Sequence, residues 1–112
     1  GDGMRDNIQG GALTETTFLI MLAVFQPRHG YGIMQFIEEK THGRVVLGAG
    51  TLYGALKALG RKGWIKPLKP QRDSRQKQYV ITEAGVGAAI QELHRLQQIQ
   101  ELAFSIIGGA AQ

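Results

Sequence analysis

The sequence predicts one small, mainly α-helical domain with a single β-hairpin and a long C-terminal helix. Its 112 residues are too few for two independently cored units. Apolar residues recur at helical spacing in four segments, and two short runs alternate as strands do. Because 43% of the residues are hydrophobic and 20% are charged, we expect the chain to fold around a core.

The first predicted helix covers residues 15–26. Thr14 can cap its start through the side-chain hydroxyl, and Pro27 stops it. Residues 18–25 are apolar on nearly all sides, so we expect neighbouring elements to cover this helix all round. Residues 28–30 are predicted to form the next turn.

Two further helices follow, separated by a short extended segment. The second helix covers residues 31–41, and Gly43 is its predicted terminator. Residues 44–47 are predicted to form a short strand, because the segment is too short for a helix and contains β-branched valines. The third helix covers residues 50–62 and has two chemically different sides. Its apolar side carries Leu52, Leu56 and Leu59. Its opposite side carries Gly50, Gly54, Lys57 and Arg61, with Tyr53 on the flank.

Residues 64–68 and 78–81 alternate like the two strands of a hairpin, and Pro67 restricts the first strand to a sheet edge. Nine residues separate Leu68 from Gln78, more than the roughly two to five of an ordinary hairpin loop. Four of the nine are basic. A long cationic hairpin loop has the character of a wing.

Thr82 can cap the last predicted helix, which covers residues 83–107 and measures about 37 Å at about 1.5 Å per residue. Its apolar stripe, which starts at Val86, is longer than a domain of this size can cover. We therefore expect helices from two copies to pair as a homodimer; the alternative is that the helix folds back on its own domain. The predicted interface residues are Ile90, Leu93, Leu96, Ile99, Ala103 and Ile106.

Positive charge is concentrated in the middle third of the chain. Between Arg44 and Lys77 there are nine basic residues and one acidic residue, a net charge of +8, whereas the remainder carries −4. Because like charges repel one another in a folded domain, this concentration indicates an external polyanion such as nucleic acid. The alternative is a solvated basic face that has no partner.

The sequence contains no arrangement of residues typical of catalysis. The glycines of residues 48–54 do not have the spacing of a dinucleotide-binding loop, and His29, His42 and His94 lack metal-ligand spacing. There is no cysteine, and the longest apolar run is far shorter than the roughly 18 residues that cross a bilayer. We expect a cytoplasmic protein that is not an enzyme, has no cofactor or metal and does not enter the membrane.

The predicted elements have the order of a winged helix-turn-helix with a C-terminal dimerisation helix: helix, helix, short strand, helix, basic hairpin and long helix. Within this order, five segments resemble the PadR family of bacterial transcriptional regulators, and the short C-terminal part resembles its small PadR-like subfamily. The segments are LTE at 13–15, HGYGI at 29–33, GTLYGAL at 50–56, KGWI at 62–65 and YVITEAG at 79–85. The resemblance implies a repressor that responds to a small, often aromatic molecule.

We expect the chain to divide into four parts. Residues 1–11 are predicted to be a disordered arm that begins with a cloning remnant ahead of Met4. Residues 12–82 form the winged helix-turn-helix DNA-binding domain, and residues 83–107 form the dimerisation helix. Residues 108–112 are expected to be a frayed tail.

In this fold the helix of residues 50–62 enters the major groove. The start of the helix suits a phosphate, and Lys57 can reach a guanine or a phosphate. Gly54, where the family often has proline, either permits close approach to DNA or is a tolerated substitution. Tyr53 and Tyr31 are each either DNA contacts or packing residues. The predicted DNA-binding residues, with phosphate or minor-groove contacts on the wing, are Tyr31, Gly50, Thr51, Tyr53, Gly54, Lys57, Arg61, Arg72, Arg75 and Lys77.

The sequence therefore predicts a transcriptional regulator that binds double-stranded DNA as a homodimer and represses from a palindromic operator. A small aromatic effector, implied by the resemblance, is expected near Phe18 and Phe104. The alternative is a winged-helix protein-interaction module that binds no DNA. Binding to double-stranded RNA is disfavoured because its narrow major groove excludes a helix.

Overall fold

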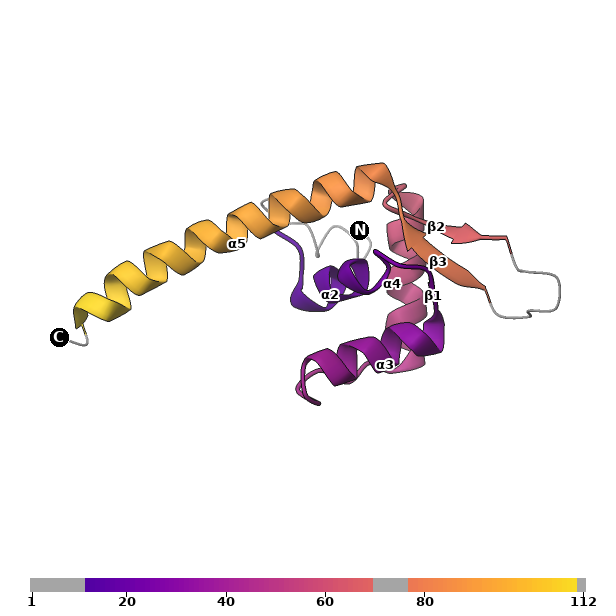
Figure 1. Cartoon of the computed structure of the whole chain (residues 1–112), viewed down its shortest axis with the longest axis horizontal. Coiled ribbons are helices and arrows are strands. Elements are labelled where there is room, and N and C mark those ends of the chain that lie inside the picture. Colours follow the sequence, from indigo (N-terminus) through magenta and orange to yellow (C-terminus); the bar gives the residue numbers. More distant parts are fainter. Residues whose placement is uncertain (1–11, 70–76, 111–112) are drawn as a thin grey trace.

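The computed structural model describes residues 12–69 and 77–110; the predicted arm and the tip of the predicted wing lie outside these ranges. Figure 1 shows three helices gathered beside a small sheet, with a fourth, much longer helix running past them. The predicted fold class, mainly α with a small hairpin and a long C-terminal helix, is confirmed. In chain order the elements are α2 (Glu15–Ala23), β1 (Arg28–His29), α3 (Gly30–Lys40), α4 (Ala49–Arg61), β2 (Ile65–Leu68), β3 (Gln78–Ile81) and α5 (Glu83–Ala110).

α2 begins as predicted but ends earlier. The Oγ1 atom of Thr14 accepts a hydrogen bond from the N–H of Thr17 at 3.1 Å, which confirms the predicted cap. The helix stops at Ala23, since Pro27, four residues later, has no N–H to donate to the Ala23 carbonyl, and the carbonyl groups at the helix end accept hydrogen bonds from other elements. The Nε of Arg28 donates to the carbonyl of Ala23 at 2.7 Å, and β3 donates to the carbonyl of Val24 at 2.7 Å.

The turn predicted at residues 28–30 is wrong, because two of these residues form β1. Arg28 pairs with Tyr79 and His29 pairs with Gln78, antiparallel to β3. His29 also caps α3, since its Nδ1 accepts a hydrogen bond from the N–H of the third helical residue at 3.1 Å. A two-residue strand is too short for its pairing to be read from alternation.

The strand predicted at residues 44–47 is also wrong, because this segment is a loop. The N–H of Val45 donates to the Oγ1 of Thr41 at 3.1 Å, so a local side chain replaces a strand partner. The predicted terminator of α3 is confirmed: Gly43 has a φ of +80° and its N–H bonds back to the carbonyl of Glu38 at 2.8 Å.

The sheet has the order β1-β3-β2, and both pairings are antiparallel. β2 is an edge strand, which confirms the prediction for Pro67, a residue that cannot donate to a neighbouring strand. Within the pair, Pro67 lies opposite Tyr79, and Leu68 lies opposite Gln78 at the base of the wing.

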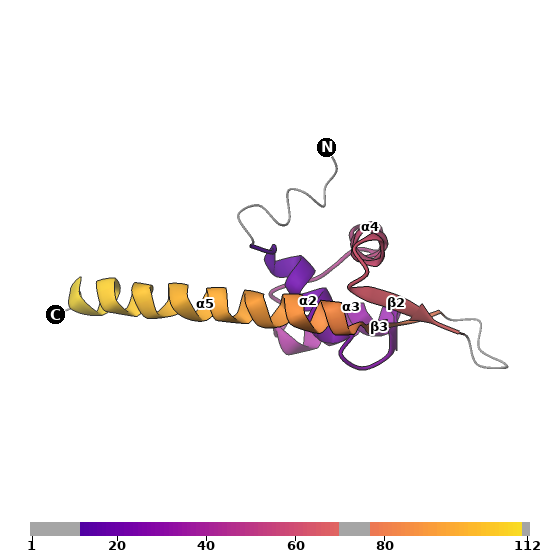
Figure 2. The ribbon, with the colours of Figure 1, turned by 90° about the horizontal axis from the view of Figure 1, so that it is seen from above.

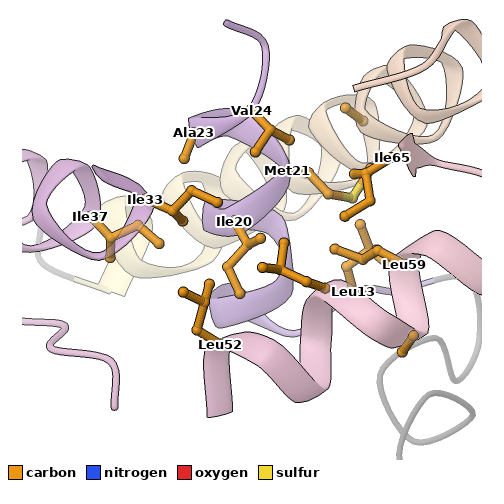
Figure 3. Close-up of a cluster of buried hydrophobic side chains, with 13 residues drawn as sticks. Leu13, Ile20, Met21, Ala23, Val24, Ile33, Ile37, Leu52, Leu59 and Ile65 are labelled. Carbon is orange, nitrogen blue, oxygen red and sulfur yellow. The ribbon is translucent and has the colours of Figure 1, made fainter. Parts of the chain in front are cut away.

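The core lies where α2, α3 and α4 meet the sheet and the first turns of α5. Figure 3 shows the buried side chains of α2 between those of α3 and α4. The predicted apolar side of α4 is confirmed as core, because all three of its leucines are buried. The thirteen core residues are Leu13, Ile20, Met21, Ala23, Val24, Ile33, Ile37, Leu52, Leu56, Ala58, Leu59, Ile65 and Ala89.

α2 is not covered all round, which corrects the expectation that neighbours surround it. Leu22 of α2 and Phe25, two residues beyond its end, are exposed by 38% and 45%, and Phe18 on the same side is half-buried. The domain places its other elements on the side of α2 that carries Ile20 and Met21. An apolar helix surface therefore stays open in the single chain.

α5 begins at the predicted cap and extends far beyond the domain. The Oγ1 of Thr82 accepts a hydrogen bond from the N–H of Gly85 at 3.1 Å. The helix has 28 residues, or about 42 Å, and Figure 2 shows its C-terminal half projecting past every other element. It continues to Ala110, three residues beyond the predicted end. Neither Gly108 nor Gly109 adopts the positive φ with which a glycine terminates a helix.

Candidate nucleic-acid interface

The predicted contact residues of α4 lie together on its exposed side. This side faces away from the buried leucines, and it leaves the backbone open at two glycines. A Cβ built on Gly50 or Gly54 would have no atom within 4 Å outside its own helix. A surface of this kind admits a close partner. The exposed residues are Gly50, Thr51, Tyr53, Gly54, Lys57 and Arg61.

The start of α4 presents backbone N–H groups. Gly48 occupies the N-cap position and provides no side-chain hydrogen bond. The N–H of Leu52 is the first to bond within the helix, to the carbonyl of Gly48 at 3.0 Å. The three preceding N–H groups, with the positive end of the helix dipole, suit an anion.

The base of the wing adds further exposed cations. On β2, Lys66 is exposed, whereas the preceding residue Ile65 is buried in the core. Lys69 and Lys77 are exposed at the two ends of the wing loop. The other two predicted wing bases, Arg72 and Arg75, lie outside the described residues.

Two cations of the basic segment have local partners. Arg44 forms a two-point ion pair with Glu15, with Nη1 and Oε1 3.1 Å apart, and this hydrogen bonding holds the pKa of Glu15 below its ordinary value. Arg44 therefore does not belong to the surface of α4 and the wing. Lys62 lies over the ring of Trp64, with Nζ 5.1 Å from the ring centroid.

The remaining described bases of α4 and the wing have no carboxylate oxygen of a described residue within 4.0 Å. Within residues 12–69 and 77–110, the ion pairs are Arg44 with Glu15 and Arg95 with Glu92. The positive charge of α4 and β2 is therefore not neutralised by the described part of the domain itself. From here on, the basic face denotes Lys57, Arg61, Lys66, Lys69 and Lys77.

Tyr53 packs against its own domain. Its ring occupies the space beside Gly30, with Cζ 2.8 Å from where a Cβ on Gly30 would lie. It also neighbours Tyr79 at the base of the wing, whose pKa is raised by burial and by Tyr53. Because Tyr53 remains 49% exposed, the ring edge is still available to a partner.

Tyr31 is exposed by 60%, so the alternative of a half-buried core tyrosine is wrong. It lines a shallow surface groove between α3 and the loop before α4, together with Met34 and Leu47. Glu38 and Glu39 line the same groove. Their negative charge disfavours a phosphate at the far end of this groove.

The predicted dimer residues are exposed in the single chain, except for the half-buried Ala103. Leu93, for example, is 56% exposed, and further apolar side chains of α5 continue the stripe to its end. α5 packs on its own domain through Gly85, Ala89 and Glu92. Leu96 and Ala103 continue the same side of the helix beyond the domain, whereas Ile90 and Leu93 lie on the neighbouring side. The two predicted effector residues lie apart: Phe18 packs against the core, and Phe104 is 69% exposed on the projecting part of α5.

The sequence reasoning missed Glu92, whose side chain is only 3% exposed. Its carboxylate accepts hydrogen bonds from Arg95 and from the N–H of Leu13 at 3.2 Å. The spacing of Glu92 and Arg95 along a helix was a signal for their pairing. The contact with Leu13 spans 79 positions and has no sequence signal.

In the described part of the chain, no helix has the length and apolar character to span a bilayer. No cluster of three metal-ligating side chains occurs in the same residues.

Comparison with known sequences identifies relatives over most of the chain. The family model described as "Transcriptional regulator PadR-like family" matches residues 19–92. The chain is 36% identical over 78 residues to an uncharacterized 37.1 kDa protein in transposon TN4556 of Streptomyces fradiae. It is 33% identical over 75 residues to the HTH-type transcriptional regulator SarZ of Staphylococcus haemolyticus. These matches cover 70% and 66% of this chain but only 21% and 46% of those proteins.

Solved structures share the fold over nearly the whole chain. A transcriptional regulator from Clostridium thermocellum is 27% identical with a TM-score of 0.67, covering 96% of this chain and 99% of that one. A PadR-like transcription factor from Bacteroides fragilis is 20% identical with a TM-score of 0.69, covering 94% and 99%. A PadR family regulator from Eggerthella lenta is 15% identical with a TM-score of 0.71, covering 82% and 80%.

Proposed function

Because the chain belongs to the PadR-like family of transcriptional regulators, we propose that it binds double-stranded DNA through α4 and the β2–β3 hairpin. The observation that carries this proposal is the basic face, whose cations have no ion-pair partner among the described residues. DNA supplies the missing negative charge at a regular spacing. α4 has buried leucines on one side and an exposed opposite side that can enter a major groove, as a recognition helix does.

Each element has a proposed role on the duplex. Lys57 donates a hydrogen bond to a guanine or a phosphate in the major groove, and Arg61 donates to a guanine or a phosphate one turn further along α4. The N–H groups at Gly50 and Thr51 bind a phosphate at the start of the helix. Tyr53 contacts the groove edge while packing on α3, and Gly54 lets the backbone approach closely. Tyr31 adds a phosphate contact at the start of α3, and the wing adds contacts from Lys66, Lys69, Arg72, Arg75 and Lys77.

We propose that residues 12–82 form the DNA-binding domain and that α5 pairs with a second copy as a homodimer. The exposed stripe along α5 supports this, because its C-terminal half projects where its own domain cannot cover it. Leu22 on the open side of α2 and Phe25 just beyond its end form a second apolar surface that a partner would cover. Burial of large apolar side chains stabilises such an interface.

A two-fold dimer presents two copies of α4, so the operator is proposed to be an imperfect palindrome. Blocking polymerase at such a site requires only that the protein be bound, so repression is the simplest outcome. A small aromatic effector is proposed to bind at the apolar surface around Phe18 of α2 and around Phe104. It would act by preferring one arrangement of the dimer, because equal affinity for both arrangements shifts nothing.

Selection of bound duplexes from a random pool tests this function. We expect the full chain to enrich two inverted half-sites at a fixed spacing of about one or two helical turns. Enrichment of single half-sites would contradict the dimer. The absence of any enriched sequence, together with capture of a protein ligand by the same domain, would support the interaction module instead.

A further inference from the structure

Hydrogen bonds connect α5 to the winged domain at two places. At its start, the hydroxyl of Thr82 donates to the carbonyl of Gly63 at 2.6 Å, and the N–H of Thr82 donates to the carbonyl of Trp64 at 2.9 Å. Gly63 and Trp64 directly follow α4, so the start of α5 is fixed to the end of the proposed recognition helix. The second joint is Glu92, ten residues further along the helix.

The Glu92 joint connects α5 to the start of α2. The Oε1 of Glu92 accepts from the N–H of Leu13 at 3.2 Å and from the Nε of Arg95 at 3.0 Å, and Oε2 accepts from a second Arg95 nitrogen. Leu13 is itself a buried core residue, directly before the cap of α2. Only a carboxylate accepts all three bonds without presenting a donor of its own to this buried site.

Beyond Glu92 the helix has no further hydrogen bond to the domain in the part that the structure describes, and 18 residues project as an arm of about 27 Å. A rotation of about 10° at the joint moves the end of such an arm by about 5 Å, more than the roughly 3.4 Å rise of one base pair. The angle at which α5 leaves the domain therefore decides how far apart the two copies of α4 lie.

Building on the proposed homodimer, we propose that Glu92 is a positioning residue that fixes the angle between α5 and the winged domain. It thereby determines the half-site spacing that the dimer prefers. The start of α5 is fixed at Thr82, and the bond from Glu92 to Leu13, together with the packing of Gly85 and Ala89, opposes rotation about that start. Loss of this bond leaves the dimer contacts and the basic face intact, but it widens the range of distances between the two winged domains of the dimer.

The first test measures this separation directly. The chain has no cysteine, so a nitroxide attached at Gln35→Cys, an exposed residue of α3, reports one distance between two copies by pulsed electron resonance. The Glu92→Gln side chain keeps the volume but replaces one acceptor oxygen by an N–H donor that faces the Arg95 guanidinium, so the joint is weakened and we expect a distance distribution about twice as wide. Glu101→Gln, an exposed charge loss on the same helix, is the matched control and should leave the width unchanged.

The second test reads the spacing from DNA. Duplexes that carry the selected half-sites with spacers varied one base pair at a time should show a sharp optimum for the native chain, with a loss of about tenfold beside it. In the Glu92→Gln protein, the loss of affinity beside the optimal spacer should be only about threefold, while the affinity for a single half-site stays the same. If Glu92→Gln does not fold, Arg95→Gln removes the two hydrogen bonds that orient the Glu92 carboxylate toward the N–H of Leu13, and so weakens the same joint.

The outcomes separate this inference from the function on which it rests. A Glu92→Gln or Arg95→Gln dimer with native width and native spacing preference would overturn the role of Glu92 alone. If the native labelled chain shows no distance between copies, the homodimer fails, and the inference fails with it.

Discussion

The ring of Tyr53 fills the space beside Gly30 that a side chain at residue 30 would require. The Cζ atom of Tyr53 lies 2.8 Å from the position of that missing Cβ. The contact joins α4 to the start of α3, and Tyr79 of the sheet lies next to the same ring. The position of the proposed recognition helix therefore depends on a glycine in another helix.

Gly30→Ala is expected to displace the Tyr53 ring. Because the ring is about half exposed, it can rotate away, and the free energy of unfolding should fall by only about 1 kcal/mol. In a Tyr53→Ala background the same change should have no cost, since the space is empty. Denaturant unfolding of the four proteins measures this coupling, and additive effects would contradict the contact.

Gly85→Ala is expected to be far more damaging. A Cβ on Gly85 would collide with the backbone carbonyl of Trp64 and approach Cγ1 of Ile81 to 2.7 Å, and backbone cannot move aside as a side chain can. We expect a loss of about 2–3 kcal/mol in the free energy of unfolding. Gly87→Ala is the matched control: it has open space and should stabilise the helix by up to about 1 kcal/mol. Equal thermal shifts for the two variants would contradict this packing.

Glu92→Gln is expected to lower the free energy of unfolding at neutral pH by about 1–3 kcal/mol. The hydrogen bonds from Arg95 hold the pKa of Glu92 below its ordinary value of about 4.5; burial opposes this effect, and the N–H of Leu13 adds to it. A carboxyl group with a lowered pKa in the folded state stabilises the protein above its ordinary pKa, and this stability is lost as the pH falls.

The difference between the native chain and Glu92→Gln should therefore be constant near neutral pH and shrink as the pH drops below about 4.5. Unfolding by urea at a series of pH values measures it. A difference that is independent of pH down to acid would show that the pKa of Glu92 is the same in the folded and unfolded states, and would contradict the stabilising hydrogen bonds to its carboxylate.

The elements with strong local signals could be predicted from the sequence. The leucine stripe of α4, the Thr14 and Thr82 caps and the edge position of Pro67 each follow from a few neighbouring residues, and the structure confirms them. The two-residue β1 could not be predicted, because its only partner is a strand about 50 positions later.

The charge pattern overstated the basic surface for a similar reason. Arg44 belongs to the basic segment by position, yet it pairs with Glu15, which comes 29 residues earlier. The apolar run of α2 was likewise expected to be covered on all sides. The spacing of apolar residues shows which sides of a helix can be buried, but it does not show whether another element packs on each side. The burial of Glu92 depends on tertiary contact and has no local sequence signal.

Leu93→Glu or Leu96→Glu is expected to produce monomers with weakened DNA binding, because the charge would lie in the proposed seam between two copies of α5. Gln98→Glu, also exposed on α5 but on another side of the helix, is the control and should remain dimeric. Analytical ultracentrifugation measures the mass of each protein. An intact Leu93→Glu dimer would place the interface elsewhere.

Lys57→Ala is expected to weaken binding to a selected operator by about 1–3 kcal/mol if Lys57 reads a base. Arg44→Ala removes a cation of the same sequence segment that is already paired with Glu15, so it should change operator affinity little. Fluorescence anisotropy with operator and random duplexes measures both. An equal loss on random DNA would assign Lys57 to a phosphate.

Contact between the basic face and the phosphates of a duplex is the central proposal for this protein, and salt titration of duplex binding tests it directly. If a dimer neutralises about six phosphates, the logarithm of the association constant should fall with the logarithm of salt concentration at a slope near −5. The slope should become shallower in Lys66→Ala, which removes an exposed cation of the wing. An affinity that does not change with salt, or the same slope in both proteins, would contradict the assignment of this face to DNA.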